Sequence, residues 1–186
     1  SAKIGVKELN RPEDLEWDPG RKLVYVAFTK HGRRNALDAN GVLHDPATQA
    51  STAVRPDSVG SIFAIVENNQ NDPSQSTTFT FWRVLQGTQG TGPLDVANPD
   101  NLMLDADGDL WFGTDGNFGT NDTADGVYYV DIATNGFGRP FRVIAGPSDS
   151  EFTGPCFSSD MTTLFGSVQH PGEGETSNWP TDRNWE

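Results

Sequence analysis

One pattern occurs three times in this chain of 186 residues: an acidic or polar start, a short apolar strand, a turn and a second apolar strand. The three copies begin at Arg11, Asn98 and Glu151. Further runs rich in β-branched and aromatic residues, bounded by Gly, Asn, Asp or Pro, also predict strands. These runs cover residues 60–66, 77–85, 126–132 and 140–144. A four-stranded unit that recurs along the chain is typical of a β-propeller.

We therefore expect an all-β fold in which residues 1–186 form a partial β-propeller domain of four-stranded antiparallel blades. The first blade is predicted at 11–97, with a long polar insertion at 31–58. The second is predicted at 98–147, and 148–186 would begin a third. Because a propeller ring closes with ~4–8 blades, the chain is predicted to supply about half a ring. The missing blades would come from the same polypeptide, of which this chain is a fragment, or from another chain; we favour the fragment.

Composition narrows the possible partners. The chain has 26 acidic and 13 basic residues, a net charge of −13. Such a field repels a phosphate backbone and attracts cations, so we expect no nucleic-acid partner. No apolar run reaches the roughly 18–20 residues that cross a bilayer, so no membrane span is expected. The single cysteine, Cys156, excludes an intrachain disulfide and is expected to be a small buried hydrophobe.

The repeat also predicts a chemical site. In a propeller the first strand of each blade lies next to the axis, so Glu13, Asp100 and Glu151 are expected to meet at one mouth of the channel. Crowded carboxylates repel each other unless a cation lies between them, and calcium prefers such oxygen ligands. Asn101 would add a neutral oxygen. Arg11, beside such a cluster, would suit a phosphate oxyanion.

Simpler roles compete with this hypothesis. Glu13 and Asp100 lie next to prolines and could merely end strands. The run 115–125 is expected to be a solvated loop, with a second cation site as the lesser alternative. Three aromatic residues are expected in the core: Trp82, Trp111 and Phe165. Five aspartates are expected to form turns rather than bind metal: Asp18, Asp105, Asp107, Asp109 and Asp160.

Six motifs in order resemble the C-terminal half of the PhoX-type alkaline phosphatases. They are Arg11–Asp18 (RPEDLEWD), Asn98–Leu102 (NPDNL), Leu110–Gly116 (LWFGTDG), Glu151–Pro155 (EFTGP), Leu164–Glu173 (LFGSVQHPGE) and Ser177–Pro180 (SNWP). The resemblance covers nearly the whole chain. It implies a secreted or periplasmic bacterial phosphomonoesterase on a six-bladed propeller, with calcium and iron at the axial mouth.

By motif, the resemblance implies that Arg11 contacts the substrate phosphate. It implies that Glu13, Asp100, Asn101 and Glu151 belong to the metal cluster. The iron-binding cysteine and further ligands of the family lie in its N-terminal half, so the missing N-terminal blades of the same protein would complete the site. The reaction implied is metal-assisted hydrolysis of a phosphomonoester.

Two other functions fit parts of the pattern. One is a calcium-dependent propeller lactonase or esterase with an axial calcium site; Arg11 argues against it, because a lactone needs no cationic clamp. The other is a non-catalytic propeller module that serves in interaction or is stabilised by calcium. Metal analysis together with a phosphatase assay on full-length and truncated chains would separate this module from an enzyme.

Overall fold

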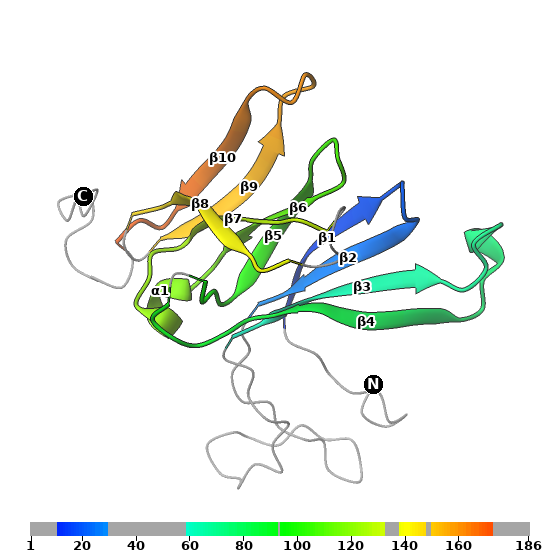
Figure 1. Cartoon of the computed structure of the whole chain (residues 1–186), viewed down its shortest axis with the longest axis horizontal. Helices are drawn as coiled ribbons and strands as arrows, with labels where there is room; N and C mark the ends of the chain where they lie inside the picture. Colours follow the sequence, from blue (N-terminus) through cyan, green and yellow to red (C-terminus); the bar gives the residue numbers. More distant parts are fainter. Residues whose placement is uncertain (1–10, 30–58, 93, 133–137, 148–149, 173–186) are drawn as a thin grey trace, which may run out of the picture.

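The structure is a computed structural model that describes residues 11–29, 59–92, 94–132, 138–147 and 150–172. The predicted insertion at 31–58 and the motif at 177–180 lie outside these ranges. The described strands form three antiparallel sheets that lie side by side (Figure 1).

The first sheet contains four strands in sequence order. They are β1 (Pro12–Asp18), β2 (Leu23–Phe28), β3 (Ser61–Glu67) and β4 (Phe79–Gln86), with the short 3-10 turn η2 (Pro73–Gln75) between β3 and β4. Each strand pairs antiparallel with the next. β-Branched and aromatic residues dominate β2 and β3, which fits their place inside the sheet.

The second sheet repeats the same order. It contains β5 (Pro99–Leu104), β6 (Leu110–Thr114), β7 (Gly126–Val130) and β8 (Phe141–Ala145), with α1 (Asn117–Asn121) between β6 and β7. The third sheet pairs β9 (Glu151–Phe157) with β10 (Leu164–Gln169). The prediction of an all-β fold with four-stranded antiparallel sheets is confirmed. Each sheet lies within one range predicted as a blade, while the blade boundaries themselves stay a prediction.

The first strands of the three sheets are neighbours. β5 packs beside β1 on one side and beside β9 on the other. This arrangement is that of adjacent blades in a partial propeller (Figure 1). It brings the starting ends of β1, β5 and β9 into one region of the molecule.

The core lies between the first and second sheets. Tyr25 and Ile62 are fully buried on one side, and Phe112 and Tyr128 are buried on the other. The rings of Phe112 and Tyr128 stack with centroids 5.4 Å apart. Burying such side chains is the main stabilising contribution, worth about 1.5–3 kcal/mol for each large apolar residue.

Three of the four residues that were predicted to be buried are exposed: Trp82, Phe165 and Cys156. Trp82 is 39% exposed because β4 is the outermost strand of its sheet, and no other described strand pairs with its far side. Phe165 is 55% exposed, and its cross-strand partner Cys156 is exposed as well. The prediction of burial is therefore wrong for these three residues, whereas Trp111 is partly buried against Tyr129.

Candidate functional site

The acidic residues expected at the channel mouth lie where two inner strands are irregular. The pairing of β1 with β2 shifts between Pro12 and Asp14, around Glu13. The pairing of β5 with β6 shifts between Pro99 and Leu102, around Asp100 and Asn101. Such bulges turn side chains out of the regular alternation and are common next to active sites. Local backbone irregularity therefore contributes to the direction of these side chains.

The acidic side chains at this end lie near enough for their charges to act on Asp100. Asp100 is 5% exposed, and its pKa is raised to about 7. Burial is the largest cause, followed by the negative charges of Glu151, Glu13 and Asp115, and Arg11 opposes the shift. The carboxylate of Asp100 accepts no hydrogen bond from the described residues. A cation would stabilise a carboxylate that is buried among other negative charges and accepts no hydrogen bond from the described residues.

Glu151 lies at the start of β9, on the other side of β5 from Glu13. Its pKa is raised by burial and then by the charge of Asp115, while a hydrogen bond from Gln169 lowers it. In that bond Nε2 of Gln169 donates to Oε2 of Glu151 at 2.7 Å. Glu151 is thus part of the same electrostatic cluster as Asp100.

Arg11 directly precedes β1 and makes two ion pairs. Its Nε atom is 2.8 Å from Oε1 of Glu13, and its Nη2 atom is 3.1 Å from Oδ2 of Asp115. The side chain remains 51% exposed. A guanidinium group has five N–H donors, so donors remain for a ligand oxyanion.

Asp115 lies in the motif at 110–116 and begins the run 115–125, but no role at the predicted site was assigned to it from the sequence. It directly follows β6 and forms an antiparallel bridge with Glu151. The close approach of β6 to β9 depends on Gly113, because a Cβ atom there would lie 2.2 Å from the carbonyl oxygen of Phe152. Sequence periodicity could not have found Asp115, since it follows a second strand and the repeat concerned first strands.

Asn101 connects β5 to β9. Its Oδ1 atom accepts the backbone N–H of Gly154 at 3.0 Å. This bond places the amide beside the carboxylates, and a carbonyl oxygen retains a second lone pair. A role for Asn101 as a cation ligand stays a prediction.

The donor set fits a hard cation such as calcium, because the side chains at this end of β1, β5 and β9 offer oxygen atoms. Among the residues that the structure describes, no three or more His, Cys, Asp or Glu side chains form a group that could hold a metal ion. The described carboxylates therefore offer part of a coordination shell rather than a closed one. Nothing in this donor set selects iron, and Cys156 lies near the far end of β9 from Glu151.

The loop behind the site is ordered by buried polar groups. Oδ1 of Asp125 accepts the backbone N–H of Asn117 at 2.7 Å. Oδ1 of Asn117 accepts the N–H of Ala97 at 2.9 Å, just before β5. Asn117, Asn121 and Asp125 are all buried. The expectation of a solvated loop at 115–125 is therefore wrong, because this segment packs its amides against the start of the second sheet.

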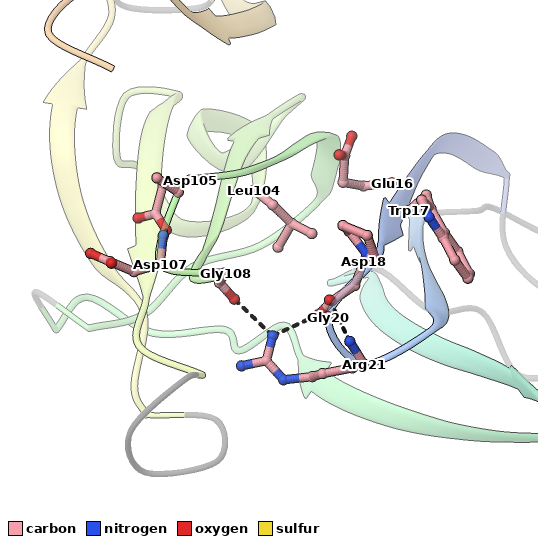
Figure 2. Close-up of a pocket in the computed structure, with 11 residues that line it drawn as sticks. Glu16, Trp17, Asp18, Gly20, Arg21, Leu104, Asp105, Asp107 and Gly108 are labelled. Carbon is pink, nitrogen blue, oxygen red and sulfur yellow. Dashed lines mark hydrogen bonds and ion pairs between the residues drawn. The ribbon is translucent and has the colours of Figure 1, made fainter. Parts of the chain in front are cut away.

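A pocket of about 760 Å³ lies at the opposite end of β1 and β5 (Figure 2). There Nη1 of Arg21 donates to Oδ2 of Asp18 at 2.6 Å and to the carbonyl oxygen of Gly108 at 3.0 Å. These bonds join the β1–β2 turn to the β5–β6 turn. Oδ1 of Asp105 also accepts the N–H groups of Asp107 and Asp109 within its turn.

The predicted turn roles are confirmed for Asp18, Asp105 and Asp160. Oδ1 of Asp18 accepts the N–H of Arg21, and Oδ1 of Asp160 accepts the N–H of Thr162. Asp109 has a different role: Oδ2 accepts the hydroxyl of Tyr129 at 2.7 Å, and Oδ1 accepts the N–H of Ile132. Asp109 thus connects the start of β6 to the end of β7.

Comparison with known proteins bears on the family and the fold of this chain. The sequence matches the family described as alkaline phosphatase PhoX over residues 1–172. This chain belongs to the PhoX family. No curated protein sequence matches it. Among solved structures it is similar to Pseudomonas fluorescens PhoX in complex with vanadate, a transition state analogue.

The likeness to that PhoX structure has a TM-score of 0.62 at 24% sequence identity, which supports the fold. The match covers 97% of this chain and 32% of the Pseudomonas chain, so this chain spans about a third of that PhoX protein. The described part of the chain contains no helix that is long and apolar enough to span a membrane.

Proposed function

We propose that this chain is part of a phosphomonoesterase of the PhoX family. One observation carries the proposal. The guanidinium of Arg11 is held between two carboxylates, beside the buried Asp100 and at the point where the inner strands of three sheets meet. A cationic donor next to an acidic cluster suits a phosphate ester bound together with cations.

In this proposal Arg11 binds the phosphoryl oxygens and neutralises charge that they carry during transfer. Glu13, Asp100, Asn101 and Glu151 hold calcium and iron, of which iron rests on the family resemblance alone. A bound cation supplies Lewis-acid stabilisation of the phosphoryl group. Burial of Asp100 favours ligation, because a cation removes the cost of a buried carboxylate. A secreted or periplasmic location also rests on the resemblance.

The partners of this chain are the remaining blades of the same protein. The first sheet buries Tyr25 against the second sheet, yet its opposite face is apolar as well. On that face Leu15 is 65% exposed, Trp17 is 51% exposed and Phe81 is 44% exposed. A sheet with two apolar faces fits a position between two neighbours. Because the solved PhoX chain is about three times longer, a preceding blade of the same protein is the fitting occupant.

The test uses the full-length protein and a simple aryl phosphate as the probe. Glu13→Gln and Asp100→Asn should each abolish turnover and lower the bound calcium. Asp107→Asn, which removes an exposed carboxylate from the distant β5–β6 turn, should change neither. Retained turnover with full metal content in both site variants would refute the assignment.

The same protein also decides between the proposal and its rivals. A lactonase would hydrolyse a simple lactone and depend little on Arg11. A non-catalytic module would bind calcium and turn over neither probe. We expect turnover of the aryl phosphate alone, with loss of phosphate inhibition in Arg11→Ala. Lactone turnover without aryl phosphate turnover would favour the lactonase.

A further inference from the structure

The two carboxylates that form ion pairs with Arg11 belong to different sheets. Glu13 lies in β1, two residues after Arg11, which directly precedes that strand. Asp115 is 104 residues away from Arg11 in sequence and follows the second strand of the next sheet. The contact with Asp115 therefore fixes the guanidinium relative to the second and third sheets. Glu13 alone could not do this, because it moves with β1.

The backbone of Asp115 is held on two sides. Its N–H donates to the carbonyl oxygen of Asn98 at 3.0 Å, just before β5. Its bridge to Glu151 ties it to the start of β9. The residue that follows, Gly116, has a φ of 92°, a left-handed conformation that glycine adopts without strain. The carboxylate thus projects from a point that both neighbouring strands define.

An arginine side chain that is half exposed has many rotamers, and fixing them costs about 2 kcal/mol of side-chain entropy. With one contact at Nε, the guanidinium of Arg11 could still change its direction. A second contact at Nη2 determines its plane. Within the described residues Nη1 has no acceptor, so this part of the group is available to an oxyanion ligand.

We propose that Asp115 is a positioning residue that holds Arg11 in the orientation for binding a phosphoryl oxyanion. This inference rests on the proposed function of Arg11. Asp115 acts through Arg11 rather than on the substrate, because its Oδ2 atom is directed at the guanidinium.

The test measures inorganic phosphate binding by calorimetry and aryl phosphate kinetics on the full-length protein. Asp115→Asn keeps the shape of the side chain and removes its charge. We expect about a tenfold rise in the Kd for phosphate and in KM, equivalent to about 1.4 kcal/mol, with kcat changed less than about threefold. Arg11→Ala should show a larger rise, and the double variant should bind phosphate no more weakly than Arg11→Ala.

Asp107→Asn serves as the control for the loss of one negative charge, because it removes an exposed carboxylate far from Arg11. If Asp115→Asn lowers the unfolding midpoint, Asp115→Glu decides, since it keeps the charge and should bind phosphate more tightly than Asp115→Asn.

Additive effects of Asp115→Asn and Arg11→Ala on phosphate binding would overturn the positioning role. A loss of kcat with unchanged phosphate affinity would overturn it as well. Normal phosphate binding by Asp115→Asn would overturn it while leaving the phosphatase proposal intact. A wild-type protein that neither binds phosphate nor hydrolyses the ester would overturn both.

Discussion

The carboxylate of Asp14 joins the first and second sheets by accepting the backbone N–H of Leu102 at 2.8 Å. Its other oxygen accepts the N–H of Leu15 at 2.7 Å. Leu102 follows Asp100 by two residues, and Asp14 follows Glu13 directly. One side chain therefore sets how β1 lies against β5 at the point where both strands present their acidic residues.

Replacing Asp14 by alanine should destabilise the chain. The N–H of Leu102 would lose its acceptor in a partly buried position, which costs about 1–3 kcal/mol of unfolding free energy. Urea unfolding followed by tryptophan fluorescence measures this change. Asp107→Ala is the control, because its carboxylate accepts no hydrogen bond within the described residues. Equal unfolding midpoints for the two variants would show that the bond between the sheets contributes nothing.

Gly113 should tolerate no side chain. A Cβ atom there would lie 2.2 Å from the backbone carbonyl oxygen of Phe152, so β9 would have to move away from β6. We expect Gly113→Ala to lower the unfolding free energy by about 1–3 kcal/mol, the usual cost of overpacking. The shift of β9 should also displace Glu151 from Asp115 and weaken calcium binding in the full-length protein.

Gly119 provides the matched control for Gly113. It lies within α1, and a Cβ atom built there meets no other atom within 4 Å. Gly119→Ala should leave stability unchanged or raise it by up to about 1 kcal/mol, because alanine restricts the unfolded chain and favours helix. Equal losses in both alanine variants would mean that the approach of β6 to β9 is not tight.

The sheets could be predicted from sequence because their signals are local. Runs of β-branched and aromatic residues between turn residues predicted the strands, and the repeat of acidic starts predicted that Glu13, Asp100 and Glu151 would share one end. The exposure of Trp82 and Phe165 could not be predicted this way. Whether an apolar strand is covered depends on its place in the sheet, and both residues lie on edge strands.

The part of the candidate site that was not predicted from the sequence depends on contacts between blades. Asp115 becomes relevant only when β6, β9 and the start of β1 are placed together, and no sequence period relates it to Arg11. The order of the loop at 115–125 comes from buried amides such as Asn117, whose partners lie before β5. Polar residues in a loop resemble a solvated segment until their partners are known.

Asp125 should give the stability of the chain a measurable pH dependence. Burial raises its pKa to about 6 in the folded protein, against about 3.9 in an unfolded chain. The folded state therefore binds the proton more tightly, and the resulting stability is present below about pH 4 and lost as the pH rises to about 6. The loss amounts to about 3 kcal/mol.

Asp125→Asn should remove only the part of the pH dependence that Asp125 contributes, since asparagine does not titrate and can still accept the N–H of Asn117. Asp100, whose pKa is raised to about 7, should keep its own contribution in both proteins. Urea unfolding in calcium-free buffer at about pH 4 and about pH 6.5 gives the change in unfolding free energy for each protein. Asp122→Asn is the control, because it removes an exposed carboxylate from the same loop. A variant at Asp125 with the same pH dependence as wild type would show that other groups cause it.

The apolar face of β1 should behave differently in the isolated chain and in the full-length protein. Leu15 and Trp17 pair with Val26 and Val24, so they point away from the buried Tyr25. If a preceding blade covers them, the double change Leu15→Ser and Trp17→Ser should lower the unfolding midpoint of the full-length protein, at a cost of about 3–6 kcal/mol. In the 186-residue chain the same change should cost less than about 1 kcal/mol and reduce aggregation, because the face is open there.

Leu94→Ser, at another exposed position, serves as the control in both proteins. Equal small effects of the double change in both proteins would mean that no blade packs on this face.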